Sequence, residues 1–333
     1  MGANYCLDRI YQGGAAYCIH NAATGRETTM PHRIPLAMRR RKVVIVGAGP
    51  GGMEAARVAA ERGHEVMVFE ANDGPGGQVR LAAQSPRRRE MMGIIDWRYE
   101  RCQSMGVSFR FNTYAGVDEV LGENPEVVII ATGGLPNEQE LESGNELAVT
   151  GWDILSGQVK PGRNVLVYDD AGDHTALQAA EMIAATGASV EFMTPDRALA
   201  PEVMAMNLVP YMRSLQTQDV RFSPTFRLVR IRRDGDGLIA TVSSDYTELD
   251  LERRVDQVVV NFATLPLDEL YFDLKPYSSN LGAVDYGDLI AGKAQSERRN
   301  TEGRFQLFRI GDAVAQRNTH AAIYDALRFV KNL

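Results

Sequence analysis

Short runs of apolar residues, many of them β-branched, alternate along this chain with longer amphipathic stretches. Residues 43–46 (Val-Val-Ile-Val) are typical of a parallel strand that is buried on both faces. Residues 53–62 are rich in Ala and Glu and predict a helix that ends at Gly63. Residues 65–69 form the next apolar run. This order of strand, helix and strand predicts a βαβ unit and an α/β fold.

The pattern restarts near Trp152 and predicts a second βαβ unit, with strand 164–168, helix 175–185 and strand 189–193. The remaining predicted elements are a helix over 90–105, strands over 107–111 and 127–130, a helix over 201–215, an antiparallel meander over 222–232, 238–243 and 248–254, a strand over 257–261, a loop over 275–302, a strand over 307–310 and a helix over 319–331. We therefore expect two Rossmann-like three-layer units.

The turn after the first strand has the spacing G-x-G-x-x-G, formed by Gly47, Gly49 and Gly52. The first glycine allows the tight turn, the second lets a pyrophosphate approach the backbone, and the third lets the helix pack against the sheet. The helix N-terminus directs unpaired N–H groups and its positive dipole end at the phosphates. The pattern predicts a nucleotide site. The alternative is an ordinary βαβ unit whose glycines serve packing alone.

Glu70 ends the second strand at the distance where a carboxylate accepts hydrogen bonds from a ribose diol. A carboxylate there disfavours a 2′-phosphate, so we expect the adenosine end to be unphosphorylated. Two further strand ends carry candidate ligand contacts. Thr132 and Gly133 follow the strand over 127–130, and Gly311 and Asp312 follow the strand over 307–310, where a backbone N–H and a carboxylate can bind a ribityl chain or a ribose.

The corresponding turn of the second unit differs in charge. It reads Asp169-Asp170-Ala171-Gly172-Asp173-His174, so three carboxylates stand where phosphates would lie. Their repulsion makes an NAD(P)H site at this turn unfavourable. Asp169 and Asp170 are adjacent on a turn and are expected to point apart, which argues against a paired acid–base role. His174 is expected to be a surface residue at a helix N-terminus.

Composition limits the class of protein. The chain has 333 residues, enough for two domains, with 44% hydrophobic residues and a net charge of −7, which argues against nucleic-acid binding. No apolar run has the length of a membrane span, and the N-terminus lacks the features of a signal peptide. Three cysteines suit a reducing compartment, so we expect a cytoplasmic protein.

Residues 1–35 hold Cys6 and Cys18 and are expected to form an irregular arm. Two cysteines at this spacing could be half of an iron–sulfur ligand set, because a cubane cluster takes four thiolates. The alternative is a pair of small buried thiols. Cys102 is expected to be a buried, unreactive thiol. No residue of the chain stands out as a chemical catalyst.

Four segments together resemble the motifs of flavoproteins with two dinucleotide-binding domains: Gly47-Ala48-Gly49-Pro50-Gly51-Gly52, Gly76-Gly77-Gln78, Ala131-Thr132-Gly133 and Ile310-Gly311-Asp312. Within that group, the arm from Cys6 to Asn21 is similar to the trimethylamine dehydrogenase and 2,4-dienoyl-CoA reductase family. The Asp169-Asp170 turn and the stretches 261–274 and 307–327 most resemble its N-methylproline and dimethylglycine demethylases.

The resemblance implies an FAD site, with ADP as a possible occupant instead. The residues it would use are Gly47, Gly49, Pro50, Gly51, Gly52, Glu70, Ala71, Gly77, Gln78, Ala131, Thr132, Gly133, Gly311 and Asp312. It also implies an arm over 1–38, an FAD-binding domain in two parts over 39–150 and 266–333, and a degenerate NAD-type domain over 151–265 inserted between them.

Members of that family begin with a barrel that carries FMN, followed by a [4Fe-4S] cluster. The barrel is absent from this sequence and only two of the cluster cysteines, Cys6 and Cys18, match; Ala3 stands where another would be. The resemblance therefore implies a longer chain or a partner subunit that supplies the barrel and the other ligands. It further implies an electron acceptor such as an electron-transfer flavoprotein, and an oligomer.

The expected function is the FAD-binding, electron-relaying part of an amine demethylase. Two alternatives stay open at this point. One is an NAD(P)H-dependent flavin reductase of the dienoyl-CoA reductase type, and the other is a non-redox module that binds ADP or FAD as a structural element.

Overall fold

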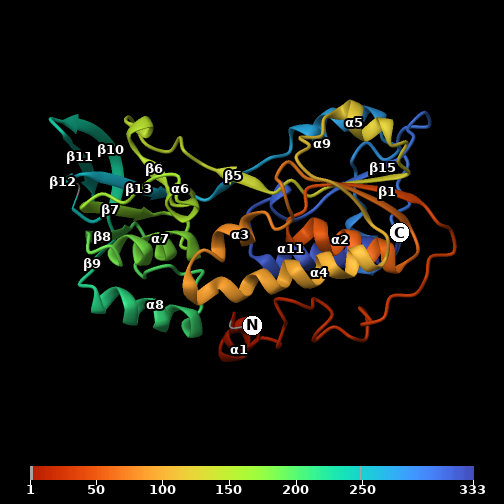
Figure 1. Cartoon of the computed structure of the whole chain (residues 1–333), viewed down its shortest axis with the longest axis horizontal. Coiled ribbons are helices and arrows are strands. Elements are labelled where there is room, and N and C mark those ends of the chain that lie inside the picture. The colour runs from red at the N-terminus through yellow and green to blue at the C-terminus, as the bar shows by residue number, and fades with distance from the viewer. Residues whose placement is uncertain (1–2, 248) are drawn as a thin grey trace.

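The computed structural model describes residues 3–247 and 249–333, and it contains two parallel sheets joined by a narrow ribbon (Figure 1). The first sheet has the strand order β15-β4-β1-β2-β3. Its strands are β1 (Lys42–Val46), β2 (Glu65–Phe69), β3 (Ser108–Arg110), β4 (Val127–Ile130) and β15 (Gln306–Arg309), all paired in parallel. The last strand thus returns to the first sheet after the chain has built the second.

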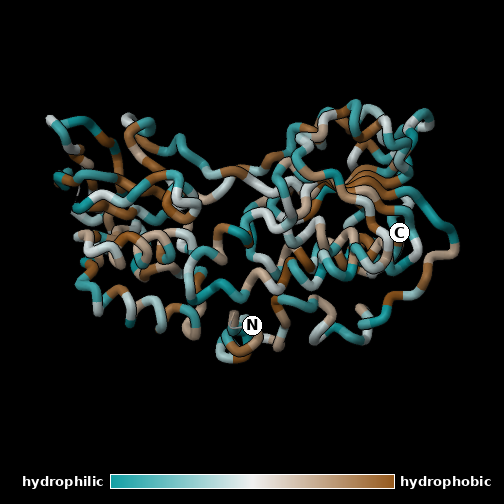
Figure 2. Tube along the Cα trace, in the orientation of Figure 1, coloured by the Kyte–Doolittle hydropathy of each residue, from teal (hydrophilic) through white to brown (hydrophobic). Residues whose placement is uncertain are grey.

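Helices cover both faces of the first sheet. On one face lie α2 (Pro50–Glu61), α4 (Gly93–Ser104) and α11 (Thr319–Val330), and on the other α5 (Val117–Gly122) and α9 (Glu269–Leu274) (Figure 1). Alternate residues of β1 serve the two faces: Val43 and Ile45 pack with the first set of helices, and Val44 and Val46 with the second. Apolar residues accordingly concentrate on these strands (Figure 2), and the continuous β-branched run is explained by burial on both sides.

The second sheet has the order β6-β13-β7-β8-β9 and is also parallel. Its strands are β6 (Val149–Thr150), β7 (Asn164–Asp169), β8 (Ser189–Thr194), β9 (Arg221–Pro224) and β13 (Gln257–Asn261). Helices α6 (Gly151–Ser156), α7 (His174–Ala184) and α8 (Ala205–Thr217) pack on one face. The other face is covered by an antiparallel sheet of β10 (Arg227–Asp234), β11 (Gly237–Ser243) and β12 (Asp250–Val255).

The two units are connected by an antiparallel ribbon, in which β5 (Gly134–Pro136) pairs with β14 (Thr264–Pro266). The smaller elements are α3 (Gln78–Ala82), α10 (Tyr286–Ile290) and the 3-10 turns η1 (Pro86–Met92), η2 (Asn145–Leu147), η3 (Lys275–Tyr277) and η4 (Gly311–Ala313). The α/β fold class with two Rossmann-like units is confirmed. The domain boundaries given above stay predictions.

Three local predictions need correction. Residues 222–224 do not join the antiparallel meander but belong to β9, which pairs with β8 and extends the parallel sheet. Thr225 has a positive φ of 65°, so the extended strand ends there and β10 begins in a new direction. The arm contains a helix, α1 (Tyr5–Tyr11). The Asp8 carboxylate of this helix accepts a hydrogen bond from the first turn of α8 and holds the two helices together. The segment 275–302 contains η3 and α10. Residue 248, the predicted start of a strand, lies outside the described residues.

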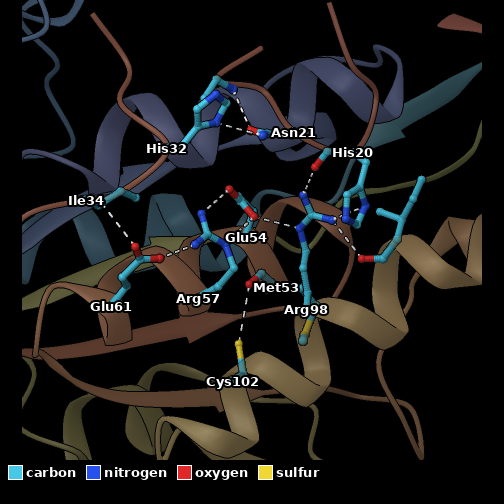
Figure 3. A network of polar contacts seen from close by, with 12 residues as sticks. His20, Asn21, His32, Ile34, Met53, Glu54, Arg57, Glu61, Arg98 and Cys102 are labelled. Atoms are coloured by element: carbon cyan, nitrogen blue, oxygen red, sulfur yellow. Dashed lines mark hydrogen bonds and ion pairs between the residues drawn. The ribbon is translucent and has the colours of Figure 1, made fainter. Parts of the chain in front are cut away.

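A buried ion pair fastens the arm and α4 to α2. Glu54 on α2 accepts hydrogen bonds from Arg98 on α4 at 2.8 Å and from Arg57 at 2.8 Å, and the Arg98 guanidinium also donates to the carbonyl of His20 (Figure 3). Burial alone would raise the pKa of Glu54, but the two guanidiniums outweigh it and lower the pKa to about 2. The carboxylate is therefore charged in the folded protein at physiological pH.

We expect the substitution Glu54→Ala to lower the free energy of unfolding by about 3–5 kcal/mol, because it leaves the Arg98 charge buried without a partner. The matched control Asp250→Ala removes an exposed ion pair with Arg230 and should cost no more than about 1 kcal/mol. Urea unfolding measures both. The charged form of Glu54 contributes fully to the free energy of unfolding at pH values above its ordinary pKa of 4.5. This contribution should be lost as the pH falls toward 2. Equal effects of the two substitutions would contradict the assignment.

Candidate functional site

The turn between β1 and α2 is built from backbone contacts that admit only glycine. Gly47 has a φ of 103°, and a Cβ atom there would lie 2.3 Å from the carbonyl oxygen of Ala131. A Cβ on Gly52 would lie 1.9 Å from the carbonyl oxygen of Gly47. These two glycines therefore bring the turn, the helix and the neighbouring strand β4 into direct backbone contact.

Gly49 has a different environment. A Cβ at this position would meet no protein atom within 4 Å. Gly49 is also the N-cap of α2, and it has no side chain that could accept hydrogen bonds from the first turn. Pro50 is the first residue of the helix, where its missing N–H costs nothing. The open space and the free N–H groups of the first turn form a cradle that fits a pyrophosphate.

Glu70 is buried, and its carboxylate both binds the backbone of the glycine turn and lines the cleft. Its Oε2 accepts from the Ala48 N–H at 2.7 Å, and its Oε1 accepts from the backbone and the side-chain amide of Asn72, each at 2.8 Å. A carboxylate has about four acceptor positions, so about one remains for a sugar hydroxyl. The contact to Ala48 was not foreseen from the sequence, although Glu70 was a predicted site residue.

The segment Gly76-Gly77-Gln78 lies over the glycine turn. The Gly76 N–H donates to the carbonyl of Ala48 at 2.9 Å, and a Cβ on Gly77 would lie 3.2 Å from the Cα of Gly49. Gln78 then reaches across the cleft, where its Nε2 donates to Oδ2 of Asp312 at 3.2 Å. Asp312 also accepts from the Arg317 N–H at 3.1 Å, and burial raises its pKa.

The end of β4 connects the site with the ribbon. The Thr132 hydroxyl donates to the carbonyl of Leu267, and the Leu267 N–H donates to the carbonyl of Gly133 at 3.0 Å. Gly133 has a φ of 76°, which a residue with a Cβ adopts only with strain. The backbone here thus turns away from the sheet toward β14.

The predicted cofactor residues come together from five separate segments of the chain. Apart from Gly52, which lies behind the turn and not on the wall, all of them line one cleft of about 1390 Å³: Gly47, Gly49, Pro50, Gly51, Glu70, Ala71, Gly77, Gln78, Ala131, Thr132, Gly133, Gly311 and Asp312. The cleft continues past Asp312 to the second unit, where α6 and α7 form its wall. The residues present fit an adenine dinucleotide.

The acidic turn of the second unit is held by hydrogen bonds from its own backbone and from Asn261. Asp169 is buried and accepts from the Gly172 N–H at 3.1 Å and from Asn261 Nδ2 at 2.9 Å. Asn261 also donates to Asp173 at 2.9 Å, and Asp173 caps α7 through the Thr175 N–H. Burial, with the nearby Asp173, raises the pKa of Asp169 to about 8. Asp170, in contrast, is exposed and lines the cleft.

His174 is not the surface residue expected from the sequence. It is half-buried, with its Nδ1 at 2.9 Å from Nη1 of Arg88 and 3.4 Å from the Tyr211 hydroxyl. Burial and the Arg88 charge lower its pKa to about 3. His174 is therefore neutral at physiological pH, where its ring accepts a hydrogen bond from Arg88.

Gln316 was missed from the sequence. It bridges the two units, because its Nε2 donates to Asp173 at 3.0 Å while its Oε1 accepts from the Thr264 N–H. Nothing in the local sequence distinguishes it from any exposed polar residue after the Gly311-Asp312 turn, so no sequence signal would have found it. Asn72 and Arg88 were missed for the same reason.

The two arm cysteines do not complete a cluster site by themselves. Cys6 is exposed on α1 and Cys18 is half-buried in the arm. Within residues 3–247 and 249–333, no group of three or more His, Cys, Asp or Glu residues is placed to hold a metal ion. The donors present therefore do not fit an iron–sulfur cluster without others. Cys102 is buried, which raises its pKa to about 12 and keeps the thiol protonated.

Residues 41–270 match the family described as pyridine nucleotide-disulphide oxidoreductase. The chain belongs to this family. It is 67% identical over 333 residues to "Probable N-methylproline demethylase" of Rhizobium meliloti, a match that covers 100% of this chain and 49% of the relative. It is 44% identical over 345 residues to N,N-dimethylglycine/sarcosine dehydrogenase of Chromohalobacter salexigens, with coverages of 100% and 50%.

Among solved structures, a 2-naphthoyl-CoA reductase complex superposes with a TM-score of 0.82 at 26% identity, covering 99% of this chain and 46% of that one. The chain thus spans about half the length of the relatives it matches. The family resemblance drawn from the four motifs is confirmed. The chain is an oxidoreductase-family module with a flavin or nucleotide site. In the described part of the chain, no helix has the length and apolarity needed to span a membrane.

Gly49 and Gly52 provide a matched pair of substitutions. Gly49→Ala should leave the free energy of unfolding within about 0.5 kcal/mol, because its Cβ meets only open space, but should weaken ADP and FAD binding at least about tenfold by occupying the phosphate cradle. Gly52→Ala should destabilise the fold by about 1–3 kcal/mol, because its Cβ collides with the Gly47 carbonyl. Calorimetric titration and thermal unfolding distinguish the two. Unchanged binding by the Gly49→Ala variant would contradict the site.

The raised pKa of Asp169 predicts a pH dependence of stability. Between its ordinary pKa of 3.8 and about 8 the folded state binds a proton that the unfolded state releases, so stability should fall as the pH rises through this window. Asp169→Asn removes the titrating group. The fall in the free energy of unfolding between the two pH values should then be smaller by about a few kcal/mol, the order of magnitude that proton linkage gives. Urea unfolding at pH 5 and pH 8 measures the slope. A slope that is equal in both proteins would contradict a protonated Asp169.

Proposed function

We propose that this chain is the FAD-binding, electron-relaying part of an oxidoreductase that demethylates N-methyl amines. The observation that carries the proposal is the continuous cleft that joins Glu70 to Asp312. Its glycine turn suits a pyrophosphate, and beyond that turn lie Gln78 and Asp312, polar groups that ADP alone would not need. The names of two relatives, an N-methylproline demethylase and a dimethylglycine/sarcosine dehydrogenase, support the choice of N-methyl amines as substrate class.

Each part of the site has a separate task in this proposal. The N–H groups at the start of α2 bind the diphosphate, and the remaining acceptor position of Glu70 binds the ribose. Gln78 and Asp312 orient the ribityl chain from opposite sides of the cleft. The flavin itself, when bound, would supply the ability to accept and release electrons. No residue of the chain is proposed as a catalytic acid or base.

The rest of the assembly is also proposed. We infer that an FMN-barrel domain or subunit exchanges electrons with this module, and that an acceptor such as an electron-transfer flavoprotein receives them. The relatives' greater length supports the first of these partners. Cys6 and Cys18 are proposed as two of the four ligands of a [4Fe-4S] cluster in the complete assembly, with the remaining ligands supplied from elsewhere. An oligomer is expected.

Two other functions are disfavoured by the same geometry. An NAD(P)H-dependent reductase would need to bind phosphate at the second turn, where the carboxyl groups of Asp170 and Asp173 line the cleft and would repel it. A structural module that binds only ADP would leave the half of the cleft around Gln78 and Asp312 without a ligand.

Asp312→Ala distinguishes FAD from ADP as the ligand. We expect this variant to bind FAD about tenfold more weakly than the unmodified chain and to bind ADP with unchanged affinity, because Asp312 lies at the end of the cleft away from Glu70. Gly49→Ala is the control that should weaken both ligands. Calorimetric titration with each ligand gives the affinities. An Asp312→Ala variant with unchanged FAD affinity would favour the structural module.

The reductase alternative has its own measurement. The FAD-loaded chain, mixed anaerobically with excess NADH or NADPH, should keep its flavin absorbance, because the second turn does not accept the diphosphate. Dithionite should bleach it and serves as the positive control. Rapid bleaching by either nicotinamide cofactor would refute the relay proposal in favour of the reductase.

A further inference from the structure

The N-terminal arm contacts both units. Its segment from residue 20 to 34 is part of the first unit: Ala22, Ala23 and Met30 are buried in the core that surrounds α2. Polar bonds hold the same segment, since Arg98 donates to the His20 carbonyl at 2.5 Å and the Ile34 N–H donates to Glu61 at 3.2 Å (Figure 3). This part of the arm therefore moves with the first unit.

The arm is fixed to α11 by stacked rings at two places, one on α1 and one further along the arm. His320 stacks on Tyr5 at 4.9 Å and on Tyr17 at 5.7 Å between ring centroids, and its Nδ1 donates to the carbonyl of Cys18 at 2.8 Å. The Arg26 guanidinium lies over the Tyr17 ring at 3.5 Å and over the Tyr324 ring at 4.2 Å.

The beginning of the arm is attached to the other unit. Asp8 on α1 is buried, and its carboxylate accepts from the Met206 N–H at 2.8 Å and from the side-chain amide of Asn207 at 3.0 Å. Asn207 also donates to the carbonyl of Ala3. Helix α8 has no capping side chain of its own at Met204, so Asp8 satisfies its first turn from a distant part of the sequence.

The attachment lies opposite the connection between the units. In Figure 1 the ribbon that contains β5 passes above α3, whereas α1 lies at the lower edge of the molecule, beside the end of α8 and below α4. A rotation about the ribbon would separate the units most at the lower side. Ala3, Tyr5 and Asp8 also line the cleft, so the arm closes it there.

We propose that the arm is an intramolecular strap that fixes the angle between the two units and holds the cleft at one width, with Asp8 as the bond to the second unit. Cross-unit bonds that do not include the arm run from Gln178 to the Ala82 carbonyl, from Gln316 to Asp173, from Arg87 to Glu181 and from Arg88 to His174. They bring the units into contact, and the strap prevents rotation about that contact. The proposal is independent of which nucleotide the cleft binds.

The test is pulsed EPR distance measurement on the full chain, with spin labels introduced as non-natural amino acids at Tyr246 and Ile290, which are exposed and lie on different units. The unmodified protein should give one narrow distance distribution. Asp8→Lys places a positive charge against the N-terminus of α8, and should at least double the width of the distribution. Ile10→Ala, on the exposed face of α1, is the matched control and should keep the narrow distribution.

Hydrogen exchange on the same proteins checks that the strap has been released. In Asp8→Lys, amides of the arm before residue 18 and of the first turn of α8 should exchange roughly tenfold faster, the factor expected for loss of a helix cap. A narrow distribution in Asp8→Lys, or an arm that stays protected in it, would overturn the proposal. If Asp8→Lys does not fold, Asn207→Ala replaces it, because this substitution removes one hydrogen bond to Asp8. The distance distribution should then broaden and the amides should exchange faster, each by a smaller factor; no change in either would overturn the proposal.

Discussion

The candidate site depends on one close approach of backbone to backbone. Gly47 and Gly52 touch where β1 turns into α2, and Gly47 at the same time touches the end of β4. No side chain fits at either position, so strand, turn and helix are held at the shortest distance that backbone atoms allow. This contact aims the first turn of α2 at the cleft and leaves Gly49 with open space in front of it. The N–H groups that face this space are the basis of the proposed diphosphate site.

Three nearly buried carboxylates show how differently the fold can accommodate the same group. Glu54 is paired with two guanidiniums and stays charged, with its pKa lowered to about 2. Glu70 accepts three hydrogen bonds from Ala48 and Asn72, which satisfy a carboxylate without a counterion. Asp169 has neither a cation nor enough donors, and its Oδ2 has no hydrogen-bond partner, so its pKa rises to about 8. Burial of a charge is costly unless it is compensated, and these residues illustrate each outcome.

The second unit keeps the Rossmann-like architecture, but its first turn carries the acidic residues Asp169, Asp170 and Asp173. Asp169 and Asp173 both accept hydrogen bonds from the side chain of Asn261 at the end of β13. Asp173 is also bound by Gln316 from the first unit. The turn has thus become part of the contact between the units. Together with the arm, it makes the second unit a fixed wall of the cleft in our interpretation.

The sequence by itself determined the elements and the first half of the site. The periodicity of apolar residues and the spacing of the glycines located β1, α2 and β2. This was possible because a buried strand, a tight turn and a closely packed helix each allow only a few residue types at fixed positions. The same signals identified Glu70 and, by resemblance, the segments around Gln78 and Asp312. Only the tertiary structure decided the contacts between residues far apart in the chain. These are the contacts of Asp8 with α8, of Arg98 with His20, and of Gln316 with Asp173. A polar side chain has no periodic pattern that reveals its partner, so these contacts exist only once packing has brought the segments together.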